Sequence, residues 1–230
     1  MKTIGMIGGM SWESTLSYYQ LLNQGIKQEL GGLHSAKVNL VSVDFAEIER
    51  LQHQGDWLAL AASMQQAARS VQASGADFLL IATNTMHKVA AEVEQVIDIP
   101  LLHIGDATAQ ALLEDGICKV GLLGTRFTME QDFYKQRLQQ QGLAVVIPDS
   151  QGREQIHRII YEELCQGQIN DSSKQYYLSQ IERLKQAGAE AIILGCTEIG
   201  LLLKQTDSDL PLYDTTVIHV AAAVAKSLRA

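Results

Sequence analysis

The sequence predicts an α/β protein built from two similar halves, each a parallel sheet flanked by helices. Short runs of β-branched and apolar residues alternate with longer segments of helical period, which is typical of parallel strands joined by crossover helices. Hydrophobic residues make up 47% of the 230 residues and charged residues only 19%, so the chain can bury a sizeable core. An internal repeat relates the two halves.

Eight runs have the length and composition of strands. Because they are apolar on both faces, helices are expected to cover both sides of each sheet. In chain order these runs are residues 3–7, 37–44, 77–81, 101–104, 119–123, 143–147, 190–194 and 212–214. Helical stretches separate them; within residues 56–73, for example, Leu58, Ala61, Met64 and Ala68 recur near a period of 3.6 residues.

The internal repeat is the most informative feature. Residues 75–85 align without a gap on residues 188–198, at an offset of 113, so that Thr83 matches Cys196. Two shorter pairs follow the same order: residues 4–9 with 120–125, and residues 99–101 with 210–212. A period this long excludes a solenoid and indicates two α/β domains of about four parallel strands each. The alternative is that unrelated parallel strands merely share an apolar run.

The repeat also predicts where a ligand would bind. We expect residues 1–98 plus 210–230 to form an N-terminal domain and residues 99–209 a C-terminal domain. Open parallel sheets bind ligands beyond the carboxyl ends of their strands. Two such edges facing each other would make an interdomain cleft, with Thr83 and Cys196 on opposite sides of the bound molecule.

Cys196 and Thr83 are the candidates for proton transfer. Cys196 leaves an apolar strand and enters a helix predicted over residues 197–204, whose dipole favours thiolate over thiol; the alternative is a small buried apolar residue. Thr83 is a poor acid or base by itself and would relay a proton through a neighbour or water, with helix capping as the alternative. Cys118 and Cys165 lack such a setting and are interpreted as structural.

Other polar residues near the strand ends suit a small acid. Asn84, Thr85 and Thr197 offer amide and hydroxyl donors for a carboxylate, or serve only as helix caps. Arg50, in a loop after the second strand, could hold a second carboxylate with bidentate geometry, or be a solvated surface residue. His87 is expected on a helix surface or in packing, with tuning of Thr83 as the alternative.

Two kinds of site are not expected. The Gly8-Gly9 loop lacks the G-x-G-x-x-G spacing and the following acidic residue of a dinucleotide site. Its glycines are expected to let backbone N–H groups approach a ligand closely. The six histidines form no HExxH motif or His/Cys cluster, so no metal is predicted.

Charge and hydropathy exclude several classes of partner. The net charge of −8 argues against nucleic acid and against an anionic membrane surface. No apolar run approaches the ~20 residues of a membrane span, and the N-terminus lacks the apolar region of a secretory signal. We therefore expect a cytoplasmic protein whose three cysteines are reduced.

Three segments together resemble the aspartate/glutamate racemase family, and the resemblance covers essentially the whole chain. They are Ile7–Ser11, Thr83–Thr85, where the family usually has Cys-Asn-Thr, and Gly195–Glu198. The resemblance implies a cofactor-independent racemase with two opposed cysteines as acid and base, a small-molecule amino-acid substrate and commonly a homodimer. It also implies that Arg50 contacts the substrate side-chain carboxylate, with Met10 and Gln52 nearby.

The sequence departs from the family pattern at two places. Thr83 replaces the first cysteine, which resembles the Thr/Cys variant among bacterial L-aspartate/glutamate-specific racemases. No lysine occurs in residues 163–167, where acidic-substrate members often have one. Interconversion of L- and D-aspartate or glutamate is the expected activity. The alternatives are a decarboxylase or isomerase that uses a single thiol, and a small-acid binding protein whose catalysis has decayed.

Overall fold

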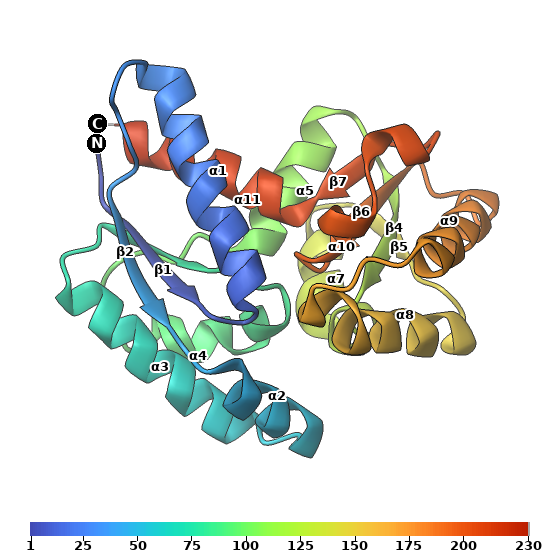
Figure 1. Cartoon of the computed structure of the whole chain (residues 1–230), viewed down its shortest axis with the longest axis horizontal. Helices are drawn as coiled ribbons and strands as arrows, with labels where there is room; N and C mark the ends of the chain where they lie inside the picture. The colour runs from blue at the N-terminus through green and yellow to red at the C-terminus, as the bar shows by residue number, and fades with distance from the viewer. Residues whose placement is uncertain (230) are drawn as a thin grey trace. The chain divides into compact units, whose positions relative to one another are not determined.

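The computed structural model describes residues 1–229, which divide into two compact units (Figure 1). Unit 1 comprises Met1–Ile104 together with the described residues from His219 onward, and unit 2 comprises Gly105–Ile218. Each unit is a parallel sheet with helices packed against it, so the predicted fold class is confirmed.

Unit 1 contains a three-stranded parallel sheet in the order β2-β1-β3. The strands are β1 (Ile4–Gly8), β2 (Val38–Ser42) and β3 (Phe78–Ile81). The fourth strand, predicted over residues 101–104, is reduced to a single parallel bridge between Leu101 and Leu79. It is this short because a helix begins at Ile104.

Helices cover both faces of this sheet. They are α1 (Trp12–Leu30), α2 (Phe45–Gln54), α3 (Trp57–Ala73), the 3-10 turn η1 (Thr85–Val89), α4 (Ala90–Glu94) and the later part of α11 (Thr215–Leu228). Figure 1 shows α1 and α3 on opposite sides of β1 and β2. One face of the sheet packs with Met64 and Val71 of α3, the other with Tyr18 and Leu22 of α1.

The sequence sets the helix ends of unit 1 locally. Ser11 accepts the N–H of Ser14 at the start of α1, and Asp44 and Asp56 cap α2 and α3 in the same way. Gly55 ends α2 at a φ of 70°, in the left-handed region that favours glycine. The helix predicted over residues 56–73 is therefore confirmed, with Asp56 as its cap.

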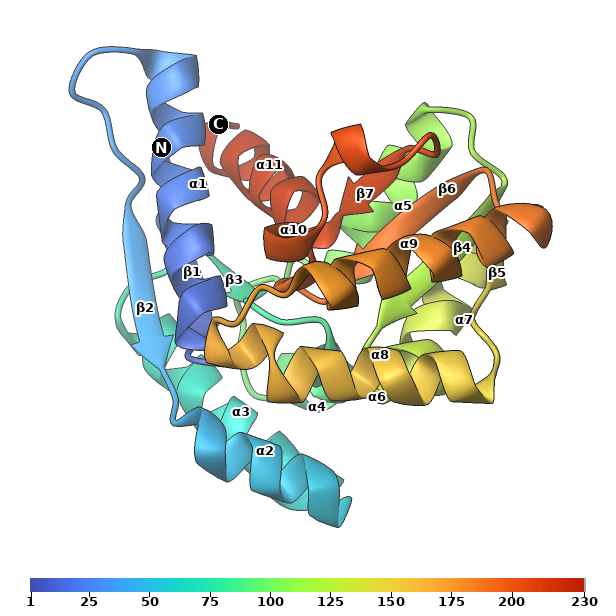
Figure 2. The ribbon, with the colours of Figure 1, turned by 45° about the vertical axis from the view of Figure 1, so that its right-hand side comes forward.

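Unit 2 contains a four-stranded parallel sheet in the order β5-β4-β6-β7. The strands are β4 (Lys119–Gly124), β5 (Ala144–Val146), β6 (Ala191–Gly195) and β7 (Leu212–Asp214). The helices are α5 (Ile104–Glu114), α6 (Arg126–Glu130), α7 (Asp132–Gln140), α8 (Ser150–Glu162), η2 (Leu164–Gln166), α9 (Asp171–Gln186), α10 (Ile199–Leu202), η3 (Gln205–Asp207) and the start of α11. Helices α8 and α9 run side by side (Figure 2), and Leu184 of α9 packs against Gly121 of β4.

The strand pairing reproduces the repeat residue by residue. In unit 1, Ile4 lies opposite Phe78. In unit 2, Val120 lies opposite Ala191, at the matching repeat positions. The last pairings match as well: Leu79 opposite Leu101, and Ile192 opposite Leu212. The two halves are thus the same fold in the same register.

The unit boundaries differ from those expected. Residues 99–104 belong to unit 1, because Leu101 pairs with β3, and residues 210–218 belong to unit 2, because β7 pairs with β6. The sequence prediction assigned each fourth strand to the wrong half. The short strand at Leu101 therefore belongs to unit 1 and β7 belongs to unit 2. The chain continues into the other unit after each of these strands.

No helix within residues 1–229 has the length and hydropathy needed to cross a membrane.

Candidate functional site

The loop after β1 is fixed by internal contacts. Gly9 has a φ of 89°, and a side chain there would collide with the backbone of Val43. Its N–H donates to Thr15 Oγ1 at 2.7 Å. The glycine is therefore needed for close packing, and its N–H group is already used, contrary to the expectation that it approaches a ligand. Met10, which follows, is buried in the core of unit 1.

The segment after β3 carries the first proton-transfer candidate. Thr83 is half-buried, and Asn84 and Thr85 are buried. The short helix η1 begins at Thr85 and has no side-chain cap, so the capping alternative for this segment is not what the structure shows. The Thr83 carbonyl lies 2.8 Å from Nδ1 of His87.

The segment after β6 carries the second candidate, and there the contact involves the side chain. The Cys196 thiol donates to Glu198 Oε2 at 3.0 Å, and the Thr197 hydroxyl donates to the same oxygen at 2.7 Å. All three residues are buried, Cys196 with 8% of its surface exposed and Glu198 with 2%. Cys196 is therefore a thiol held by a buried carboxylate.

The electrostatics of Cys196 differ from the sequence-based expectation. The helix predicted over residues 197–204 is only α10, four residues long, and it begins at Ile199. Burial raises the pKa of the Cys196 thiol well above its ordinary value, and the nearby Glu198 raises that pKa further. The expectation that a helix dipole favours the thiolate is wrong, because the desolvation and the carboxylate both favour the thiol.

Glu198 is a site residue that the sequence analysis missed as a functional group. The available signal was an acidic residue two positions after the cysteine at a buried strand exit. Tyr177 of α9 is also buried beside this group: burial raises the pKa of its hydroxyl, and the charges of Cys196, Cys165 and Glu163 raise it further. The Cys196 thiol, the Tyr177 phenol and the Glu198 carboxylate therefore share one buried region of unit 2.

The two candidates on α2 differ in orientation. Arg50 lies in this helix, whereas the sequence predicted a loop; it is exposed, and its Nη1 donates to Gln54 Oε1 at 2.9 Å. Gln52 is buried and its Nε2 lies 3.3 Å from Met86 Sδ. Residues two apart on a helix leave it about 200° apart, so Arg50 and Gln52 occupy opposite faces.

Unit 1 thus brings together part of the predicted site. Met10 and Met86 belong to one core cluster, and Gln52 contacts Met86 next to the Thr83–Thr85 segment. Arg50 does not join this group. Cys118 is exposed and Cys165 partly buried in unit 2, and neither lies at the carboxyl end of a strand.

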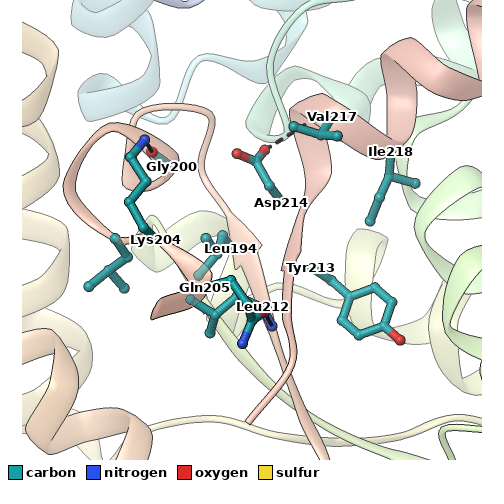
Figure 3. Close-up of a pocket in the computed structure, with 10 residues that line it drawn as sticks. Leu194, Gly200, Lys204, Gln205, Leu212, Tyr213, Asp214, Val217 and Ile218 are labelled. Atoms are coloured by element: carbon teal, nitrogen blue, oxygen red, sulfur yellow. Dashed lines mark hydrogen bonds between the residues drawn. The ribbon is translucent and has the colours of Figure 1, made fainter. Parts of the chain in front are cut away.

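A separate pocket of about 380 Å³ lies in unit 2, between α10 and the start of α11 (Figure 3). Its lining is largely apolar, and Lys204 and Asp214 are the charged residues in it. Burial raises the pKa of Asp214, and Lys204 lowers it in part. None of the site residues predicted from the sequence lines this pocket.

The fold and these strand ends define a class: duplicated α/β proteins with one proton-bearing side chain at the matching strand end of each half. The profile of the Asp/Glu/Hydantoin racemase family matches residues 7–223, so the chain belongs to this family. It is accordingly an isomerase of the amino-acid racemase class.

Individual relatives agree with this assignment. A Yersinia pestis protein assigned to the Asp/Glu racemases is 52% identical, with a TM-score of 0.92 and 100% of both chains covered. An aspartate racemase homologue from Pyrococcus horikoshii is 35% identical, with a TM-score of 0.85 and the same full coverage. The broad specificity amino-acid racemase RacX of Bacillus subtilis is 26% identical over 70% of this chain and 69% of its own length.

Proposed function

We propose that the chain interconverts L- and D-aspartate or L- and D-glutamate by a two-base 1,1-proton transfer at the α-carbon, without a cofactor. The carrying observation is that Thr83 and Cys196 follow strands of identical register in the two halves of the fold. Inversion requires one group to remove a proton from one face of the carbon and another to supply a proton to the opposite face. A duplicated fold supplies one such group from each half.

In the proposed cycle Cys196 serves the L enantiomer, as the family resemblance implies. The thiol already donates to Glu198 at 3.0 Å, so its proton can pass to that carboxylate. This leaves a thiolate and a carboxylic acid, with the total charge unchanged. The thiolate then takes the α-proton, and its sulfur becomes a thiol again.

The electron pair left on the α-carbon is delocalised into the substrate carboxylate. Donors aimed at that carboxylate stabilise the developing enolate-like charge. Asn84 and Thr85 are the proposed side-chain donors from unit 1. The Thr197 hydroxyl already donates to Glu198 at 2.7 Å. We therefore assign the contribution of Thr197 to its backbone N–H group.

Thr83 delivers the second proton in the proposed cycle. A free alkoxide is too basic to persist near neutrality, so the hydroxyl acts as a relay: it gives its proton to the α-carbon while a water molecule protonates its oxygen. The resulting hydroxide is neutralised by the proton stored on Glu198, which restores both residues. The reverse sequence converts the D enantiomer.

The acidic side chain of the substrate is the least constrained element of the proposal. We place Met10 and Gln52 beside it and assign its carboxylate to Arg50, as the resemblance implies. Arg50 now donates to Gln54 at 2.9 Å, so binding would exchange that hydrogen bond for a charge-assisted one. In unit 2, Glu163 accepts hydrogen bonds from Asn170 and Ser173 and offers no positive charge to a side-chain carboxylate.

Deuterium exchange tests the function. The protein is incubated in D₂O with L-aspartate, L-glutamate and their neutral amides, L-asparagine and L-glutamine, and the products are resolved by NMR and chiral chromatography. A racemase produces α-deuterated D-product, and the proposed specificity requires acidic substrates to react faster than the amides.

Each other outcome contradicts the proposal in a distinct way. Exchange with retained configuration would indicate a single working base, as in the alternative of a one-thiol decarboxylase or isomerase. Binding without exchange would indicate a small-acid binding protein. Faster reaction of the amides would refute the acidic specificity and leave the racemase assignment intact.

Homodimer formation and a cytoplasmic location remain predictions. Helix α1 offers one relevant feature, since Trp12, Leu16 and Tyr19 expose 66%, 56% and 51% of their surface at a spacing that puts them on one helix face. Exposed apolar patches of this kind mark interaction surfaces. Light scattering coupled to size-exclusion chromatography measures the assembly directly.

A further inference from the structure

His87 is a buried residue of unit 1 that the proposed cycle does not use. Only 3% of its surface is exposed, which agrees with the packing role that the sequence favoured and not with the surface role. Its two ring nitrogens contact backbone groups on different segments: Nδ1 lies 2.8 Å from the Thr83 carbonyl, and Nε2 lies 3.2 Å from the N–H of Ile104. The imidazole therefore links the segment that carries Thr83 to the start of α5.

These partners determine which nitrogen carries the proton. The backbone N–H of Ile104 can only donate, so Nε2 must accept and bears no hydrogen. The Thr83 carbonyl can only accept, so Nδ1 must donate. His87 is thus neutral, with its hydrogen on Nδ1, and each nitrogen is fully matched to its partner.

Two further imidazoles surround this link. The His103 ring centroid lies 4.4 Å from that of His87, and the His219 ring centroid lies 5.9 Å from it. His219 receives a hydrogen bond from the Tyr18 hydroxyl at 2.9 Å and donates to the Leu102 carbonyl at 2.8 Å. Within residues 1–229 no three potential ligands are arranged to hold a metal ion. The hydrogen bonds of His87 and His219 to backbone groups make the cluster a support for the backbone.

The repeat shows that this support exists on one side only. Gly200 occupies the position of His87 in unit 2, and Asp214 occupies that of His103. Their surroundings form the open pocket of Figure 3, with Asp214 Oδ2 against Gly200. The Cys196 carbonyl instead accepts the N–H of Ile199 at 3.1 Å. The Thr83 carbonyl is thus bonded by a side chain, whereas the Cys196 carbonyl is bonded by a backbone N–H group.

We propose that His87 is a positioning residue for Thr83, an inference that rests on the proposed function. A threonine hydroxyl acts in proton transfer only as part of a well-aligned relay, and a displacement of about 1 Å can cost about 10²-fold in rate. The Nδ1 hydrogen bond restrains the Thr83 peptide, and with it the position of the Thr83 side chain.

Two substitutions separate the two ends of the link. His87→Asn places an amide N–H near the position of Nδ1 and so can keep the bond to Thr83, whereas His87→Gln places an amide oxygen near the position of Nε2 and keeps only the bond to Ile104. His34→Asn, at an exposed histidine, is the matched control. The readout, from L-substrate in D₂O, is the ratio of D-product to α-deuterated L-substrate.

This ratio reports delivery from the Thr83 side relative to exchange on the Cys196 side. We expect His87→Gln to lower the ratio at least about 10-fold while α-deuteration of L-substrate changes less than about 3-fold. His87→Asn should stay within about 3-fold of the parent in both measurements. A merely structural role would reduce both exchange and inversion alike.

Three results would overturn the inference. One is an unchanged ratio in a folded His87→Gln protein, and another is an equal loss of both rates in that protein. The third is a ratio of D-product to α-deuterated L-substrate that falls in His87→Asn as far as it is expected to fall in His87→Gln. If His87→Gln does not fold, the result for His87→Asn is the test. If the parent protein itself shows neither exchange nor D-product, the proposed function fails first and the role of His87 fails with it.

Discussion

Thr83 and Cys196 follow β3 and β6, two strands that occupy the same register in their sheets. Different contacts hold these two residues in place. At the exit of β3, the carbonyl of Thr83 accepts a hydrogen bond from His87, and its hydroxyl is the group that we propose for proton transfer. At the exit of β6, the side chain of Cys196 is itself held, by the carboxylate of Glu198. The two halves of a duplicated fold can therefore share one backbone geometry and still differ in their contacts. In unit 1 a hydrogen bond restrains the backbone of Thr83, and in unit 2 a hydrogen bond engages the thiol proton of Cys196.

The largest expected effect comes from removing the thiol. Cys196→Ser should lower both α-deuteration and D-product by about 10³-fold or more, because a serine hydroxyl is far less acidic than a thiol. Cys118→Ser, at an exposed cysteine, is the matched control and should behave like the parent. If Cys196→Ser exchanged the α-proton at the parent rate, Cys196 would not be a proton-transfer group.

The next effect concerns the carboxylate that distinguishes the β6 exit. Glu198→Gln should slow turnover about 10²-fold, because the thiol loses its proton acceptor. The pKa of Cys196 should nevertheless fall, since the neighbouring negative charge that raises it is gone. Turnover and thiolate formation thus change in opposite senses.

Thiolate absorbance against pH measures this second quantity. It is recorded in a background of Cys118→Ser and Cys165→Ser, so that only Cys196 contributes. An unchanged or raised thiol pKa in Glu198→Gln would show that the carboxylate does not control this proton.

A smaller, opposite effect should follow from making the two exits alike. Thr83→Cys replaces the hydroxyl after β3 by a thiol, which is a better acid and base, and turnover should rise about 10-fold. Because the enantiomers have equal free energy in water, kcat/KM must rise equally in both directions, which initial rates from L- and D-substrate will check. No gain would count against Thr83 as the second proton-transfer group.

The smallest effect is on stability and tests the imidazole cluster of unit 1. Burial lowers the pKa of His219 from 6.5 to about 4, so between these values unfolding takes up a proton. Stability should therefore fall as pH falls through this window, by up to about 1.4 kcal/mol per pH unit from this group.

Denaturant unfolding across that window provides the measurement. In His219→Gln the slope of unfolding free energy against pH should be smaller by about one proton, whatever its absolute stability. Parallel slopes in the two proteins would show that His219 is not held neutral by burial. The Tyr18 hydroxyl, the Leu102 carbonyl and the His87 ring are the groups that face this imidazole.

Much of the fold was predictable, because local patterns carry it. Alternating apolar runs and helical periods located seven of the eight predicted strands, and the aligned segments 75–85 and 188–198 anticipated the shared register. The run at 101–104 looked like a strand by composition, but Ile104 begins a helix and only Leu101 pairs. Strand length there depends on where the next helix starts, which composition does not encode.

The site was predictable in position and less so in chemistry. The sequence identified Thr83 and Cys196 as strand-end residues, because parallel strands expose their carboxyl ends to ligands. It placed Arg50 in a loop and expected a thiolate at Cys196, and both expectations failed. Helix α2 turns Arg50 to the surface, and burial with Glu198 protonates the thiol.

By itself the sequence determined that this protein is a duplicated α/β chain with a hydroxyl and a thiol at equivalent positions, because periodicity and repeats are properties of the linear order. The resemblance of three short segments added the racemase family. Only the tertiary structure decided the proton on Cys196, the tautomer of His87 and the partner of each. These depend on desolvation and on atoms brought together from distant segments, such as Ile104 beside His87. Proximity of that kind arises only when the chain folds.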